Sequence, residues 1–424
     1  MSVRVWLAQW AAQAGYWAVL ATIVVAPTQW DILNIQGGRG CHISLVDPLL
    51  GFAFLCWVVR VLARGSWWRM PWPWPWPVLA FVLPALLSLV MVERGGAGEA
   101  LRETAKLVAY FGVGYLLYDD LLRNQAQRLR IVLGLLLAVT VAMVLLALVQ
   151  FFIYTDPVRG VSGAFESRNV LGGWLALMLP MAAAVALHAE RLLVRVGLWL
   201  LVVVGLLVDL TAASVGAVLC VVALLAAVRG ARAFVVFTLG ATLWLGVLSA
   251  HMGGFLQPET SARLTSQQVL FQSVALYQDG QPERRYPQWQ SALEMMLSNP
   301  WLGVGIGNYQ RRVEQYTGAK PMPTGPSEPC IQNLYLVIGS TMGVPALLGF
   351  LALLLLPAFG AGAVARRHAG WRRGVVYGVT GGLAAFAVTA IWHPLLVRGI
   401  GLHLVLLLVM ARLLAEWSAG KVRG

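Results

Sequence analysis

Charged residues are scarce in this sequence. Asp, Glu, Lys and Arg make up 12% of its 424 residues, whereas soluble globular domains average about 25%. So few charges cannot cover a water-facing surface of this size, which excludes a soluble enzyme and a disordered chain. Cysteine and histidine are also few, with four and six residues. A disulfide-rich secreted module is therefore excluded, and the scattered histidines do not have the spacing of a metal site.

Long apolar runs take the place of the missing charge. Hydrophobic residues make up 59% of the chain, in unbroken stretches rather than the short alternating strands of a membrane barrel. A membrane-spanning helix needs about 20 mostly apolar residues, and this criterion predicts about twelve such helices. The sequence thus predicts an all-α polytopic membrane protein. The predicted spans are 8–26, 45–63, 77–93, 105–122, 131–153, 168–188, 192–209, 212–229, 233–250, 331–358, 374–392 and 397–416.

The basic residues predict the orientation of these spans. Lys and Arg number 31 against 18 Asp and Glu, a net charge of +13. Arg and Lys collect in the cytoplasmic loops of membrane proteins, and the predicted spans place about 18 of them on the side of the N-terminus. We therefore expect an even number of spans with both termini in the cytoplasm. The first apolar stretch is expected to be a retained helix rather than a cleaved signal peptide.

A long polar segment separates two groups of spans. The first nine spans fall within residues 1–250, the polar segment covers 251–330 on the outer face, and 331–424 holds the last three spans and a cytoplasmic tail. Loops longer than about 15 residues are usually functional or disordered. An amphipathic helix is predicted near 286–298, ended by Asn299-Pro300, and lies on the membrane or caps a cavity. Its apolar face is expected to hold Trp289, Ala292, Leu293, Met296 and Leu297.

A glycine-rich block follows this predicted helix. Gly303, Gly305 and Gly307 do not fit a nucleotide-binding fingerprint, because they follow a helix and their spacing differs from G-x-G-x-x-G. The outer face is also the wrong compartment for a nucleotide. We interpret the block as a turn that returns the chain toward the membrane.

Two arginine pairs lie in the same polar segment, at Arg284-Arg285 and Arg311-Arg312. Guanidinium groups bind phosphate oxygens through paired hydrogen bonds. The alternative is that these arginines are solvated and paired with the neighbouring Glu283 and Glu314. The charge pattern leaves both interpretations open.

Two further features belong to the outer face or the membrane surface. The Trp- and Pro-rich run 67–77 is predicted to be extended, because alternate prolines lack the N–H donor of a helix. Its indoles suit the headgroup depth of a membrane, and a proline-rich partner-binding motif is the alternative. Cys41 and Cys330 are both expected on the oxidising outer face, where a disulfide between them is one hypothesis.

Several ordered blocks resemble a known family. Residues 163–169 precede an apolar span, Arg285 and the run 299–309 form an outer-loop helix and glycine block, and 332–336 with Gly343 begin the next span. In this order and spacing, over roughly residues 160 to 350, the sequence resembles the O-antigen ligase and polymerase family of bacterial inner-membrane glycosyltransferases.

The resemblance implies a reaction and its partners. Proteins of this family transfer a glycan from undecaprenyl diphosphate to a hydroxyl group on the periplasmic side of the membrane. In ligases the hydroxyl belongs to lipid A-core, and in polymerases it belongs to another lipid-linked glycan. Arginines would stabilise the charge that develops on the diphosphate leaving group. No metal or cofactor is implied. The expected partners are the lipid-linked glycan, an acceptor glycolipid or glycan, membrane lipid and other polysaccharide-assembly proteins, with no nucleic acid.

The resemblance and the outer-face positions together define a candidate site. The diphosphate-binding candidates are Arg168, Arg284, Arg285, Arg311 and Arg398. The catalytic candidates are Glu166, Gln332, Glu328 and His393. The candidates for lining the substrate cavity are Asn169, Asn308, Tyr309, Asn333 and Tyr335.

Two positions depart from the family pattern. The family's His-Asn pair reads Gln332-Asn333 here, and glutamine cannot act as a general base. An arginine expected to bind phosphate at the eighth span is Val215. Three interpretations follow: a divergent ligase or polymerase that uses other groups, a family member without a catalytic role that binds lipid-linked glycan or scaffolds an assembly complex, and an unrelated transporter. No internal repeat or pair of broken spans favours the transporter.

Overall fold

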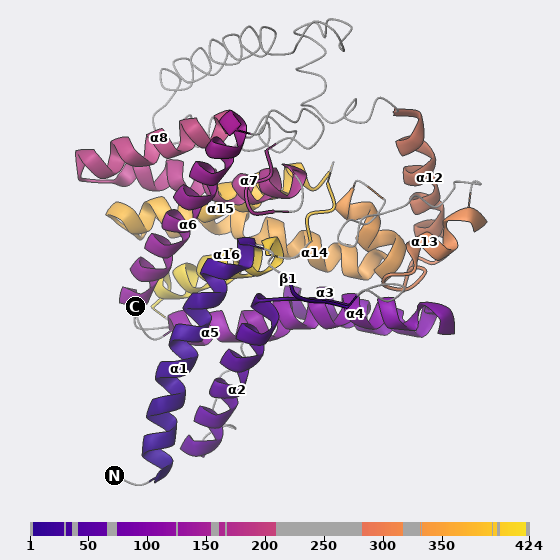
Figure 1. Cartoon of the computed structure of the whole chain (residues 1–424), viewed down its shortest axis with the longest axis horizontal. Helices are drawn as coiled ribbons and strands as arrows, with labels where there is room; N and C mark the ends of the chain where they lie inside the picture. Colours follow the sequence, from indigo (N-terminus) through magenta and orange to yellow (C-terminus); the bar gives the residue numbers. More distant parts are fainter. Residues whose placement is uncertain are drawn as a thin grey trace, which may run out of the picture.

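The residues that the structure describes form helices and one short β-hairpin (Figure 1). The computed structural model describes residues 3–28, 31–35, 41–65, 74–123, 126–153, 161–165, 168–208, 282–316, 331, 333–391, 393–396 and 399–420. Its longer helices are α1 (Val3–Val25), α2 (Val46–Arg64), α3 (Trp76–Leu87), α4 (Ala97–Leu107), α5 (Tyr115–Arg123), α6 (Ala126–Ile153), α7 (Arg168–His188), α8 (Leu192–Val208), α12 (Pro282–Ser298), α14 (Leu334–Arg366), α15 (Gly370–Thr389) and α16 (Ile400–Ser418).

The predicted spans agree with these helices. Each predicted span within the described residues overlaps a helix, whereas 212–229 and 233–250 lie outside them, so the count of twelve stays a prediction. Among the described residues, six segments are long and apolar enough to cross a membrane: Val3–Thr28, Val46–Arg64, Gln127–Gln150, Asn169–His188, Leu334–Arg366 and Ile400–Ser418. The chain is therefore a polytopic helical membrane protein.

The hairpin between α1 and α2 was not part of the all-α prediction. Strand β1 (Asp31–Ile35) pairs antiparallel with β2 (Cys41–Ser44), and Ile35 lies opposite Cys41. Its strands are too short to produce a strong alternating pattern in the sequence. The backbone N–H of Ser44 donates to Asp47 Oδ2 at 2.9 Å, which ties the end of the hairpin to the first turn of α2.

One helical rod runs the length of the predicted fourth span. α4, the π-helix η5 (Val108–Gly114) and α5 follow one another without a break from Ala97 to Arg123. At 1.5 Å per residue the rod is about 40 Å long, close to the thickness of a bilayer with its headgroups. The indole of Trp74, from the Trp- and Pro-rich run, donates to the Gly112 carbonyl of the π-helix at 2.9 Å. Helix α3 already begins at Trp76, so the last two residues of that run are helical rather than extended.

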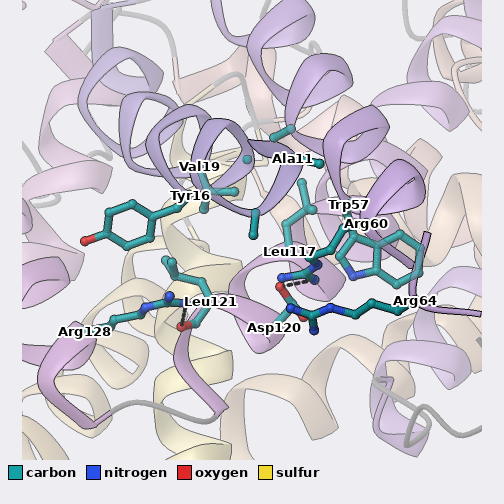
Figure 2. A pocket seen from close by; sticks show the side chains of 13 residues that line it. Ala11, Tyr16, Val19, Trp57, Arg60, Arg64, Leu117, Asp120, Leu121 and Arg128 are labelled. Carbon is teal, nitrogen blue, oxygen red and sulfur yellow. Dashed lines mark hydrogen bonds and ion pairs between the residues drawn. The ribbon is translucent and has the colours of Figure 1, made fainter. Parts of the chain in front are cut away.

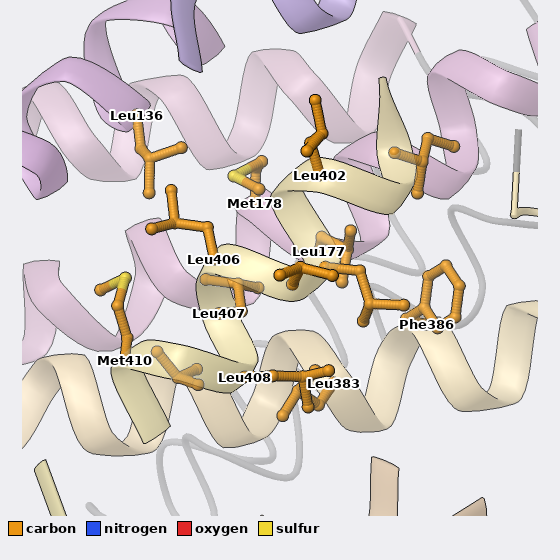
Figure 3. Packing of buried hydrophobic residues seen from close by; sticks show 14 of the residues in the cluster. Leu136, Leu177, Met178, Leu383, Phe386, Leu402, Leu406, Leu407, Leu408 and Met410 are labelled. Atoms are coloured by element: carbon orange, nitrogen blue, oxygen red, sulfur yellow. The ribbon is translucent and has the colours of Figure 1, made fainter. Parts of the chain in front are cut away.

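The main core lies where α7, α15 and α16 pack together (Figure 3). Gly374, Gly378 and Gly382 form a stripe on α15 that lies against the backbone of α7; a Cβ on Gly378 would lie 2.7 Å from the Cα of Met181. Small residues at this spacing let two membrane helices approach closely. The leucines of α16 fill the space beside this pair, and Leu402, Leu406 and Leu407 are fully buried.

Helix α14 is broken near its start. Gly343 has φ 87°, a left-handed conformation that interrupts the helix, and Pro345 follows without an N–H donor. A side chain at Gly343 would collide with the carbonyl oxygen of Trp301. The break thus gives the polar outer segment a place to dock against the membrane helices.

Candidate functional site

The segment from 282 to 316 folds onto the first turns of α14. A small hydrophobic core, separate from the main one, joins them: Ala292, Met295, Val304, Tyr309, Val313 and Ile331, with Trp289, Tyr316, Leu336 and Val337 packed against it. In Figure 1, α12 and the short helix α13 (Tyr309–Arg312) lie at the end of the bundle where α14 begins. The position of this segment is therefore set by a membrane helix.

Helix α12 confirms the predicted helix but buries a different face. Ser291, Ala292 and Met295 are fully buried, whereas Leu293 and Leu297 are 44% and 69% exposed. The predicted apolar face therefore faces the protein only in part. The reason is that small residues allow α12 to approach α14 closely, and the larger apolar residues next to them point outward with Trp301.

The glycine block is a turn, as predicted, and it packs on backbone. Gly303, at φ 63°, would place a Cβ 2.5 Å from the carbonyl oxygen of Ser340. The Val304 N–H donates to that same Ser340 oxygen at 2.8 Å, and the Val344 N–H donates to the Pro300 oxygen at 2.8 Å. Two main-chain hydrogen bonds thus fix the loop to both sides of the break in α14.

The other side of the loop touches the start of α4. The Ile306 N–H donates to Ser88 Oγ at 3.3 Å, and a Cβ on Gly307 would lie 3.3 Å from the backbone of Ala100. Asn308 is fully buried and donates through Nδ2 to the Val304 oxygen at 2.9 Å. The loop is therefore held between two membrane helices that are far apart in the sequence.

The two neighbouring arginines of α13 have different environments. Arg312 forms an ion pair with Glu93 at 2.7 Å and donates to Gln315 Oε1 at 2.9 Å. Its partner is Glu93 rather than the Glu314 expected from the sequence. Arg311 makes no ion pair within the described ranges, and its Nη1 lies 3.3 Å from where a Cβ on Gly95 would sit.

Arg311 lies over two glycines at the N-terminus of α4. Its Nε and Cδ lie 3.4 Å from the Cβ position of Gly96, the residue that precedes α4. A helix N-terminus attracts anions through its free N–H groups and its dipole. Without side chains at Gly95 and Gly96, nothing separates the guanidinium from that backbone. The arrangement suits an anion held by both.

Several buried polar atoms of this region lack a hydrogen-bond partner within the part of the chain that the structure describes. Buried polar groups are normally satisfied, so each exception needs an explanation such as a ligand or water. They are Asn308 Oδ1, both side-chain polar atoms of Gln310, Arg311 Nε and Arg312 Nε. Asn308 Oδ1 lies 3.1 Å from the Cβ position of Gly96 and so shares the space next to Arg311.

A second polar group lies where α7 begins, α14 begins and α15 ends. Asn333 caps α14 by accepting from the Leu336 N–H at 3.0 Å, and Tyr335 donates to the Ala387 oxygen at 2.6 Å. The glycine stripe of α15 lies against α7 in an antiparallel register. Continuing this register along the two helices places Asn169 opposite Ala390. The Asn169 Oδ1 is buried without a partner among the described residues.

His393 belongs to the same end of the bundle. It follows α15, is 1% exposed and donates through its backbone N–H to the Thr389 oxygen at 3.2 Å. The Leu334 N–H donates to the Ala390 oxygen at 2.9 Å, which joins the start of α14 to the end of α15. Asn333 and Tyr335, from one block of the sequence, and His393, from another, thus lie at the same end of the bundle.

Other predicted site residues fall where side chains are not described. Arg168 begins α7, Arg284 and Arg285 lie in the first turn of α12, and Cys41 begins β2, with positions known from the backbone. The remaining calls lie outside the described residues: Glu166, Glu328, Gln332, Arg398 and Cys330. The disulfide hypothesis and the roles of these residues stay predictions. Among the described residues, no group of three or more His, Cys, Asp or Glu is placed to hold a metal ion.

Sequence reasoning missed the partners that η3 (Ser88–Met91) and the segment between η3 and α4 contribute. Gly95, Gly96, Ser88 and Glu93 all contact the loop, although they precede it by some two hundred residues. The one available signal was the glycine-rich turn at 95–98 between two predicted spans. Gln310 was also missed, because a lone glutamine next to an arginine pair has no motif of its own.

Comparison with known proteins agrees with this arrangement. Residues 165–351 match the sequence model of the family described as O-antigen ligase. The match covers the start of α7, the α12 segment, the glycine block and the first half of α14, which contribute to both polar groups. A search of curated proteins finds none that matches the chain. The match confirms the resemblance seen in the sequence, and residues 165–351 are similar to the O-antigen ligase family.

Proposed function

We propose that this protein transfers or polymerises a glycan carried on undecaprenyl diphosphate, at the periplasmic face of a bacterial inner membrane. The family match supports a membrane glycan ligase or polymerase. The positions of the arginines support this orientation in the membrane. Arg60, Arg64 and Arg128 lie around one end of the rod formed by α4, η5 and α5, and Arg311 lies at the other end. Both termini would then be cytoplasmic, and the α12 segment periplasmic.

The observation that carries the proposal is Arg311, which lies over the N-terminus of α4 and makes no ion pair among the described residues. A diphosphate leaving group carries two or more negative charges, and bond breaking adds charge to the oxygen nearest the sugar. A fixed guanidinium and backbone N–H groups, already in place before the reaction, stabilise that charge. Asn308 Oδ1 lies in the same space, and neither it nor the side chain of the nearby Gln310 has a hydrogen-bond partner among the described residues. They suit sugar hydroxyls or the amide of an acetamido sugar.

The second polar group is proposed to receive the acceptor hydroxyl. Asn169 and Asn333 supply amides, and His393 is a histidine at that end of the bundle whose position is described. Transfer requires the acceptor hydroxyl to lose a proton as it attacks the anomeric carbon. Gln332 cannot take this proton, so His393, Glu166 and Glu328 are the candidates. The bond from sugar to diphosphate breaks as the new glycosidic bond forms, with no metal or cofactor required.

The replaced family histidine favours one alternative. With Gln332 at that position, the protein could bind lipid-linked glycan and organise other assembly proteins without catalysing transfer. The two functions differ in a measurable way. A scaffold would be needed for normal glycan output, yet its purified form would form no product from a lipid-linked donor and an acceptor.

The deciding experiment compares Arg311→Gln with Arg312→Gln. The two positions are adjacent in the chain and the change of charge is the same, but Arg312 is held in a half-exposed ion pair whose loss costs at most about 1 kcal/mol. Each variant is expressed in a strain lacking the gene, with protein amount checked by immunoblot and glycan output by gel electrophoresis. Purified protein is then assayed with undecaprenyl-diphosphate-linked glycan.

We expect turnover by Arg311→Gln to fall by about 10²–10³-fold, as on removal of one transition-state donor. Arg312→Gln should keep most of its activity. Equal activity of the two variants would remove Arg311 from the diphosphate role. Absence of any product with the wild-type protein, together with altered glycan in the deletion strain, would instead support the scaffold.

A further inference from the structure

A basic cavity lies at the opposite end of the bundle from the α12 segment. It has a volume of about 200 Å³ and opens between α1, α2, α5 and the start of α6. Figure 2 shows the Arg60 and Arg64 side chains entering from α2 and Arg128 from the other side. The remaining walls are Ala11, Ala12, Gly15, Tyr16, Val19, Ala53, Trp57, Leu117, Asp120 and Leu121.

Positive charge is in excess in this cavity. Three guanidinium groups face one carboxylate, Asp120, which pairs with Arg60 at 2.6 Å. Arg128 donates to the Leu121 oxygen at 3.2 Å, and its guanidinium lies 4.9 Å from the centre of the Tyr16 ring. Arg64 forms no ion pair within the described ranges. The cavity is therefore prepared for an anion that can accept from more than one arginine.

Arg60 is too deeply buried for an arginine whose only role is to set the orientation of the protein in the membrane. Its side chain is 14% exposed, and its Nε is buried with no hydrogen-bond partner among the described residues. An arginine whose role is to mark the cytoplasmic side extends into water, where its donors are satisfied. A buried guanidinium with an unmet donor instead calls for a partner beyond the described residues, such as a bound ligand.

The surroundings of the cavity are apolar and suit lipid. Its wall between α1 and α2 consists of the small residues Ala11, Ala12, Gly15 and Ala53. The outward surfaces of these two helices expose Trp10, Trp17, Leu55 and Leu62 by 50%, 66%, 58% and 66%. Acyl chains can lie along such a surface while the headgroup enters the cavity. Basic pockets between membrane helices on the cytoplasmic side recognise anionic headgroups in this way.

This cavity is separate from the candidate functional site. Asp120 and Gly96 lie near the two ends of the rod formed by α4, η5 and α5, and 24 residues at 1.5 Å each place them about 36 Å apart. One ligand headgroup cannot occupy both. We propose that the cavity binds the phosphate headgroup of an anionic membrane phospholipid, held by Arg60, Arg64 and Arg128. This inference does not depend on the glycan-transfer reaction.

The test uses the full-length protein, purified in detergent, delipidated and titrated with phosphatidylglycerol or with phosphatidylcholine of the same chains. Native mass spectrometry counts the bound lipid. The variant is Arg64→Gln/Arg128→Gln, which leaves the Arg60–Asp120 ion pair intact. The matched control is Arg366→Gln, because Arg366 is an exposed arginine at the last residue of its helix, as Arg64 is.

We expect the wild type and Arg366→Gln to bind phosphatidylglycerol in preference to phosphatidylcholine. The double variant should bind phosphatidylglycerol about 30-fold more weakly, and Arg64→Gln alone about 5-fold, at the usual contribution of each arginine near an anionic surface. Equal binding by the double variant and the control would overturn the proposal. A third arm adds inorganic phosphate: displacement of the lipid by free phosphate at millimolar concentration would assign the cavity to a soluble anion and overturn the lipid assignment.

Discussion

Replacing Gly303 by alanine should release the glycine loop from α14. Two effects add at this position. The left-handed backbone, at φ 63°, costs an alanine about 1–2 kcal/mol. The new Cβ would also lie 2.5 Å from the Ser340 oxygen and from the carbonyl carbon of Thr341. These are backbone atoms that cannot rotate away, so overpacking adds about 1–3 kcal/mol.

Gly65 provides a matched control. It has nearly the same backbone, with φ 62°, at the end of α2, but a Cβ there would meet nothing within 4 Å. Gly65→Ala therefore carries the backbone cost without the contact. The difference between the two variants measures the contact of the loop with α14.

Hydrogen exchange followed by mass spectrometry measures both effects. The Val304 N–H, which donates to the Ser340 oxygen, reports docking, and the Gly65 N–H, which donates to the Val61 oxygen at 3.2 Å, reports the end of α2. We expect exchange at the end of α2 to rise about 5- to 30-fold in Gly65→Ala. Exchange of Val304 should rise about 30-fold or more in Gly303→Ala. Equal increases at the two positions would refute the reasoning, since they would mean that contact with α14 contributes nothing.

Three further predictions concern packing, docking and activity. Gly378→Ala places a Cβ 2.7 Å from Met181 Cα and should lower the free energy of unfolding by about 1–3 kcal/mol. The thermal midpoint of this variant in detergent should fall. That of the control Gly51→Ala should not, because a Cβ on Gly51 meets nothing within 4 Å. Tyr309→Phe removes the hydrogen bond to the Gln288 oxygen at 3.0 Å and should weaken docking of α12 by about 1 kcal/mol, seen as faster exchange across that helix. Arg285→Ala should abolish glycan output at unchanged expression, and full activity would remove Arg285 from the diphosphate role.

Each predicted span within the described residues overlaps a helix, because length and apolar composition determine membrane helices almost directly. The face that α12 buries could not be predicted in the same way. Leu293 and Leu297 follow the helical spacing as well as Met295 does, yet Met295 is buried and both leucines are exposed. Periodicity identifies apolar residues on a helix, but it cannot distinguish those that pack on protein from those that face a membrane.

The candidate site shows a similar limit. Arg311 and Arg312 are identical in the sequence and adjacent in the chain. What distinguishes them is Glu93, which pairs with Arg312, and Gly95 and Gly96, which lie under Arg311. These partners come from the other end of the sequence, so local pattern contains no trace of them. By contrast, the turn at the glycine block was predicted, because glycine spacing is a local property of the backbone.

The two hydrogen bonds that fix the loop to α14 join main chain to main chain, at Val304–Ser340 and Val344–Pro300. Peptide groups are the same whatever side chains they carry. Under the proposed glycan-transfer function, these two attachments and the contacts with a sugar would depend on different atoms. Substitution at Asn308 or Gln310 should then change the preference for a sugar while both main-chain hydrogen bonds to α14 remain.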